Sequence, residues 1–133
     1  MSEPPPLEDA REWISRARSD LTRARAKPEG VYLEDLCFHA QQSAEKAIKA
    51  LLIWHGIKFP YVHDLAALLT LLEKATSDLP DSIRQAERLT QFAVEMRYPG
   101  AAPPVREREY EQALKLADEV LNWAEKMLKG ALR

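Results

Sequence analysis

Apolar residues recur every three or four positions along most of the chain, which is the spacing of one face of an α-helix. Prolines at positions 4–6, 28, 60, 80, 99 and 103–104 divide this pattern into five segments. No run of alternating apolar and polar residues is bounded by turn residues, so no β-strand is expected. The pattern predicts an all-α fold.

We expect four long helices and one short helix. The short helix, of about ten residues, follows Asp64, the expected N-cap. Short connections favour antiparallel neighbours, so we predict an up-and-down bundle of about five helices over residues 8–130, preceded by a Pro-rich extension at residues 1–7. The long helices are expected at about Leu7 to Lys27, Leu33 to His55 and Arg106 to Lys129, and one more begins after Pro80, with Asp81 or Ser82 as its cap, and runs to about Tyr98.

Two of these helices have distinctive faces. Ala40, Ala44 and Ala47 lie in the apolar stripe of the second helix and permit close contact with a neighbour. The fifth helix has an apolar arc of about 180°, whereas a surface helix needs only about 100°. We therefore expect it to contact more than one neighbour, inside the bundle or across a homodimer interface. The arc consists of Ala113, Leu114, Leu116, Ala117, Val120, Leu121, Trp123, Ala124, Met127 and Leu128.

Composition narrows the class of protein. Lys and Arg number 19 and Asp and Glu 21, so a net charge of −2 gives no global attraction for nucleic acid. The basic residues of the first helix exceed its acids by two; we expect them to be solvated, with nucleic-acid contact as the alternative. The one cysteine, Cys37, excludes a disulfide framework and suits the core of a protein in a reducing compartment. No long apolar run or signal-peptide pattern occurs, so we expect a soluble cytoplasmic protein without membrane contact.

The polar residues of the second helix, including His39, Lys46 and Lys49, are expected to form a solvated face opposite the alanines. Glu45 and Lys49 would then be a surface ion pair worth a few tenths of a kcal/mol. His39 has only Asp35 near it at metal-ligand spacing, so no metal site is expected. No cofactor is expected either, since the chain has no Gly-rich phosphate loop, Ser-His-Asp arrangement or acidic cluster for magnesium.

The segment 58–64 contains more polar and aromatic side chains than a structural turn requires. His63 directly precedes Asp64, and a histidine beside a helix N-terminus can bind phosphate or act as a general acid or base. The alternative is structural: Asp64 caps the helix, His63 is solvated, and Phe59 and Val62 close the end of the bundle.

The end of the fourth helix is the second candidate. At 100° per residue Arg97 falls within the apolar arc of this helix, where a guanidinium needs a carboxylate, phosphate or carbonyl partner. Alternatively, Arg97 caps the last carbonyls of the helix. Tyr98 offers a stacking face for a base or a cover for the end of the bundle.

The sequence resembles the HEPN family over about residues 9 to 129. The matching motifs are the stretch 38–52, then His63-Asp64-Leu65, and finally Arg97-Tyr98-Pro99-Gly100. The resemblance implies a bundle of about five helices that commonly forms homodimers. It also implies a partner, because such chains are often encoded beside a minimal nucleotidyltransferase, as toxin and antitoxin or as a two-protein nucleotidyltransferase. His63, Asp64, Arg97 and Tyr98 are the nucleotide- or phosphate-binding residues that it implies.

The ribonuclease members of that family carry an arginine followed after four to six residues by a histidine, and no histidine follows Arg97. We therefore expect a non-enzymatic, dimeric module that binds a nucleotide or nucleic acid and pairs with a nucleotidyltransferase. One alternative is an endoribonuclease toxin in which His63 is the acid or base and Arg97 stabilises charge. Another is a purely structural dimerisation domain. His63 and Arg97 are expected to approach each other at one end of the bundle.

Overall fold

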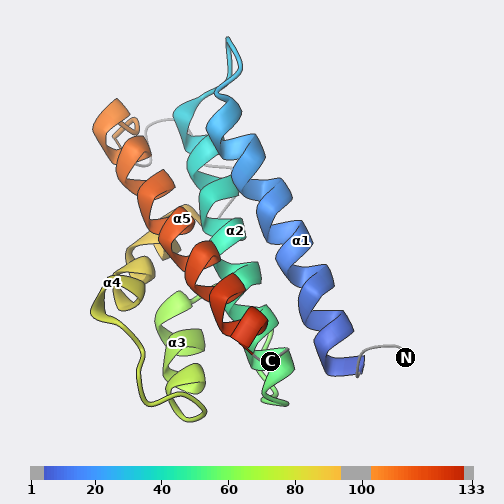
Figure 1. Ribbon diagram of the computed structural model, residues 1–133. Coiled ribbons are helices and arrows are strands. Elements are labelled where there is room, and N and C mark those ends of the chain that lie inside the picture. Colours follow the sequence, from blue (N-terminus) through green and yellow to red (C-terminus); the bar gives the residue numbers. More distant parts are fainter. Residues whose placement is uncertain (1–4, 94–102, 131–133) are drawn as a thin grey trace.

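Residues 5–93 and 103–130 are described by the computed structural model of the chain. Three long helices lie side by side: α1 (Pro5–Ala26), α2 (Leu33–Trp54) and α5 (Glu107–Gly130) (Figure 1). α1 runs opposite to α2 and α5, and α2 contacts both of the others. The described ranges contain no strand, and the predicted all-α fold is confirmed. None of these helices is long and apolar enough to cross a bilayer.

Three shorter elements lie to one side of the long helices (Figure 1). They are α3 (Leu65–Glu73), α4 (Asp81–Arg84) and the 3-10 helix η1 (Gln85–Phe92). Two of them, α4 and η1, pack against α5, and α3 packs against α2 and η1. The predicted fourth helix differs from expectation, because within its described part, residues 81–93, only the first four residues are α-helical. Its buried residues are Ile83, Ala86, Leu89 and Phe92, a spacing of three that a 3-10 helix with three residues per turn places on one face.

The 3-10 geometry changes what can be expected of Arg97. The expected placement of Arg97 assumes 100° per residue, whereas a 3-10 helix turns by about 120° per residue. Arg97 and Tyr98 themselves lie outside the described residues. Their expected orientation therefore stays a prediction. It rests on α-helical periodicity, which the preceding residues 85–92 do not follow.

Small residues allow α1 and α2 to pack closely. The alanines predicted to permit this contact are all fully buried, and α1 presents alanines of its own at a spacing of seven. Cys37 is also buried in the core, as expected. The buried alanines at this contact are Ala10, Ala17 and Ala24 of α1 and Ala40, Ala44 and Ala47 of α2.

Some basic residues at the exposed side of α1 pair with acidic residues of α5. Arg18 pairs with Glu125, and further along the two helices Arg25 pairs with Asp118. Lys27 pairs with Glu107 where α1 ends and α5 begins. Arg18, Arg25 and Lys27 thus have carboxylate partners on α5, while their side chains stay about half exposed.

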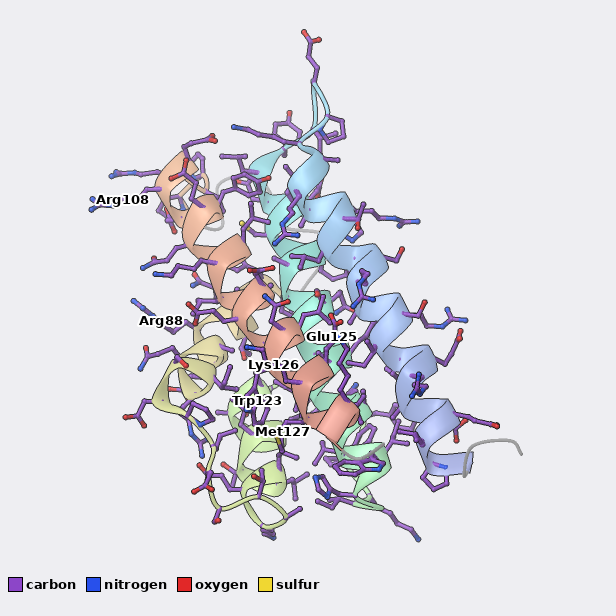
Figure 2. The ribbon with its side chains drawn as sticks, viewed as in Figure 1. Arg88, Arg108, Trp123, Glu125, Lys126 and Met127 are labelled. Carbon is purple, nitrogen blue, oxygen red and sulfur yellow. The ribbon has the colours of Figure 1, made fainter. Side chains whose placement is uncertain are left out.

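The wide apolar arc of α5 is only partly covered by its own chain. Six of its ten members are buried, while Leu114, Leu116, Trp123 and Met127 are half-buried. Figure 2 shows Trp123 and Met127 along the second half of α5. The arc thus contacts several neighbours within one chain and leaves part of its large side chains accessible.

Candidate functional site

A buried polar row runs along α2. Gln41, Glu45 and Lys49 follow one another at intervals of four and therefore lie on one face of the helix. These three residues are 0%, 3% and 6% exposed, respectively. The expectation of a solvated face with a surface ion pair is therefore wrong for this part of α2. The reason is tertiary: α1 and the segment 55–64 cover a helix face that the sequence pattern assigns to solvent.

Glu45 is the centre of this row. One carboxylate oxygen, Oε2, accepts a hydrogen bond from Lys49 Nζ at 3.0 Å. The other, Oε1, accepts one from Gln41 Nε2 at 3.0 Å and lies 2.9 Å from His63 Nδ1. Burial by itself would raise the pKa of Glu45, but hydrogen bonds from Gln41, Lys49 and His63 outweigh it and hold this pKa below its ordinary value. Glu45 is therefore a buried, ionised carboxylate.

Two aromatic rings face the ammonium group of Lys49. Its Nζ lies 6.0 Å from the ring centroid of Trp13 on α1 and 5.5 Å from that of Phe59 in the segment 55–64. Both distances lie within the range of cation–π attraction. The charge of Lys49 is thus matched by Glu45 and flanked by rings, which ties α1, α2 and the segment that carries His63 into one unit.

His63 is the accessible end of this buried row. Its side chain is 62% exposed, whereas that of Glu45, to which its Nδ1 is held, is only 4% exposed. The carboxylate thus fixes an imidazole that is otherwise open to solvent. This arrangement suits His63 to contact a ligand or to transfer a proton.

Asp64 caps α3, as expected from the sequence. Its Oδ1 accepts hydrogen bonds from the amides of Ala66 at 3.0 Å and Ala67 at 3.4 Å. The remaining amide of this first turn, that of Leu65, donates to Thr90 Oγ1 at 3.1 Å. The N-terminal amides of α3 are therefore occupied, so an anion beside His63 would depend on side chains and not on the start of this helix.

The HEPN domain model matches residues 10–127, which is most of the chain. The chain belongs to the HEPN family. The resemblance inferred from the motifs in the second helix, at His63-Asp64-Leu65 and at Arg97-Tyr98-Pro99-Gly100 is thereby confirmed at the level of the family.

Two solved structures are similar to this HEPN chain. ST0689, described as an archaeal HEPN homologue, is 33% identical, with a TM-score of 0.72 over 90% of this chain and 97% of that one. TT1696 from Thermus thermophilus is 34% identical, with a TM-score of 0.76 over 88% of this chain and 96% of that one. No curated protein matches the chain.

The expected meeting of His63 and Arg97 stays a prediction, because Arg97 lies outside the described residues. One contact bears on it. The hydrogen bond from the amide of Leu65 to Thr90 Oγ1 fastens η1 to the start of α3. η1 ends at Phe92, five residues before Arg97, so the last described turn before that position lies beside the start of α3.

A second histidine of this HEPN chain also faces a carboxylate. Asp20 of α1, 8% exposed, lies with Oδ1 3.4 Å from His39 Nδ1 and with Oδ2 2.5 Å from Lys46 Nζ. These three residues join α1 to α2 away from the Glu45 row. Across the described part of the chain, no group of three or more His, Cys, Asp or Glu side chains is arranged to hold a metal ion.

A hollow of about 170 Å³ between η1 and α5 does not include the candidate site. Its walls include Arg88, Gln91, Glu109 and Gln112, which mix both charges with amides. Arg88 appears at the outer edge of the fold in Figure 2. We therefore place the candidate site at His63 and not in this hollow.

Sequence reasoning missed the residues that support His63. Gln41 and the burial of Glu45 were not anticipated, although polar residues at 41, 45 and 49 form a visible i, i+4, i+8 row. Tyr61, two residues before His63, was also passed over and is fully exposed. The sequence shows the spacing of this row, but it does not show that α1 and the segment 55–64 cover it.

Proposed function

We propose that this HEPN chain binds phosphate groups of a nucleotide or nucleic acid at His63, together with Arg97 and Tyr98, and that it does so as the partner of a minimal nucleotidyltransferase. The observation that carries the proposal is the accessible imidazole of His63, held at Nδ1 by the buried carboxylate of Glu45. A protonated imidazole presented in this way donates a charge-assisted hydrogen bond to a phosphate oxygen.

The surroundings of His63 support a nucleotide over an isolated phosphate. Tyr61 is fully exposed in the same segment, and an exposed ring offers a stacking face to a base. Lys58 is exposed as well and adds a positive charge to the segment. Asp64 contributes by capping α3, which fixes the backbone directly after His63.

A binding titration tests this function. Fluorescence anisotropy with a labelled oligouridylate and competition with ATP, both at low salt, compare the wild type with His63→Ala and Arg97→Ala. We expect each variant to weaken binding about tenfold, the value of one charge-assisted hydrogen bond. His39→Ala is the matched control, because it removes a histidine held by Asp20 at a different place. Unchanged binding in both site variants would remove the site assignment.

The proposed partner and the homodimer are tested separately. Co-expression with the product of the adjacent gene followed by size exclusion is expected to give a stable complex if that product is a small nucleotidyltransferase. For the chain alone, the half-buried Leu116, Trp123 and Met127 of α5 support a homodimer through this helix. Sedimentation of the wild type at micromolar concentration is expected to show a dimer, and a monomer would contradict it.

An endoribonuclease is the second candidate function. A carboxylate that holds Nδ1 of a histidine is the arrangement that supports a general base at Nε2, and Glu45 and His63 have it. The binding-only proposal expects no cleavage, since no histidine follows Arg97. Metal-independent cutting of structured RNA to cyclic-phosphate ends, lost in His63→Ala and Arg97→Ala, would favour the second candidate.

A further inference from the structure

We propose that Glu45 is the positioning residue of the site: its buried carboxylate holds the proton of His63 on Nδ1 and directs Nε2 toward the ligand, whose contacting group is a phosphate oxygen. This inference rests on the proposed function, in which His63 is the residue that touches the ligand. It adds a residue from the middle of α2 that contacts no ligand itself.

The hydrogen-bonding capacity of the two groups fixes the tautomer. An ionised carboxylate only accepts hydrogen bonds, so the proton between Glu45 Oε1 and His63 Nδ1, which are 2.9 Å apart, belongs to the histidine. The neutral imidazole then carries no proton on Nε2. When the ring is protonated, Nε2 becomes a donor across the ring from Glu45, and it is this nitrogen that can reach a ligand.

Charge balance explains why the ligand should be an anion. Lys49 already neutralises Glu45 through its 3.0 Å contact with Oε2, and Gln41, the third member of the buried row, is uncharged. A proton added to His63 therefore gives the cluster a net positive charge at its only strongly exposed member. A phosphate group supplies the missing negative charge without entering the buried part of the cluster.

Burial makes Glu45 suitable for this role. Its two oxygens have partners on α2 and on the segment 55–64, so the side chain is fixed from both sides before any ligand arrives. A histidine on an exposed segment would otherwise sample several orientations, and ordering it would reduce the affinity. Glu45 removes that cost by orienting the ring in the free protein.

The first test reads the proton directly and needs no variant for its result. Imidazole 15N shifts of the whole wild-type chain are recorded at increasing pH until those of His63 no longer change, which marks the neutral ring. His63→Gln assigns the signal, and His39 and His55 serve as internal references. We expect the proton of His63 on Nδ1. A proton on Nε2 would overturn the proposal.

The second test separates positioning from a structural role. Glu45→Gln keeps the size of the side chain but removes its charge, and we expect it to increase the proportion of the Nε2–H tautomer of His63 and to weaken ATP binding three- to tenfold, by about 0.7 to 1.4 kcal/mol. Asp20→Asn is the matched control, since it alters a carboxylate beside His39 and another lysine without touching His63. This control is expected to leave the tautomer of His63 and the affinity for ATP unchanged.

The outcomes are distinguishable. A folded Glu45→Gln variant with the tautomer and affinity of the wild type overturns the role of Glu45 while leaving the proposed function intact. If His63→Ala binds ATP as tightly as the wild type, the proposed function itself fails. Should Glu45→Gln not fold, because Lys49 loses its buried partner, the 15N measurement on the wild type decides by itself.

Discussion

Replacing Tyr110 by phenylalanine probes the contact between α1 and α5. The Tyr110 hydroxyl donates to the carbonyl oxygen of Ala24 at 2.5 Å, and the residue is 4% exposed. In an α-helix this carbonyl would accept from the amide four residues later. That position is Pro28, which has no N–H, and α1 ends at Ala26 with Lys27 at a φ of 43°. The tyrosine therefore satisfies a carbonyl that its own helix cannot.

The cost of Tyr110→Phe follows from that unpaired carbonyl. A buried acceptor that loses its partner costs about 1–3 kcal/mol, and a phenyl ring replaces the rest of the side chain without a change of packing. We expect a loss of about 1.5 kcal/mol in the free energy of unfolding. For a chain of 133 residues, this corresponds to a fall in the melting temperature of about 5 °C.

Urea unfolding followed by circular dichroism measures this difference. We expect a lower midpoint at an unchanged slope, since the surface exposed on unfolding stays the same. Tyr61→Phe is the control, because it removes the same hydroxyl from a fully exposed ring and is expected to change stability by less than about 0.5 kcal/mol. A change equally small in Tyr110→Phe would refute the argument that the hydroxyl replaces the missing amide of Pro28.

Three further predictions concern other parts of the fold. Asp64→Ala removes the cap of α3 and should lower the unfolding free energy by about 1 kcal/mol in urea, whereas Asp78→Ala on the surface should leave it unchanged. Ala44→Leu overfills the contact between α1 and α2 and should cost about 1–3 kcal/mol or more by the same assay, while Ala67→Leu on the exposed side of α3 should cost little. Burial lowers the pKa of His55, so the folded state binds fewer protons than the unfolded chain, and stability should fall as the pH drops below about 6.5. Thermal melts between about pH 7 and 5 should show a smaller fall in melting temperature for His55→Gln than for the wild type. The same dependence of melting temperature on pH in both proteins would contradict this prediction.

Only part of the candidate site is visible in the sequence. The order of residues points to His63 and Asp64, because a histidine beside an N-cap can be recognised there. The sequence does not reveal that Glu45, 18 positions earlier, contacts His63. The apolar repeat of α2 does not predict which loop packs against which face of that helix. For the same reason Glu45 and Lys49 look like a surface pair. Their burial changes a contact worth a few tenths of a kcal/mol into one whose disruption is costly.

The sequence by itself determines the helices. Periodicity and prolines locate α1, α2, α3 and α5 to within a few residues, because an apolar stripe and a helix breaker act locally. The sequence also predicts that α2 can approach a neighbour closely, since Ala40, Ala44 and Ala47 lie in its apolar stripe, but not that this neighbour is α1.

Only the tertiary structure decides the helix type of residues 81–92 and which polar and apolar side chains elsewhere are buried. Burying Ile83, Ala86, Leu89 and Phe92 on one face requires three residues per turn, so packing selects a 3-10 helix where local propensity permits an α-helix. Packing likewise decides which polar face of α2 loses water, which arginines of α1 meet carboxylates on α5, and how much of α5 stays accessible. Each of these features depends on contacts between residues far apart in the chain, and the local pattern of apolar and polar residues does not predict such contacts.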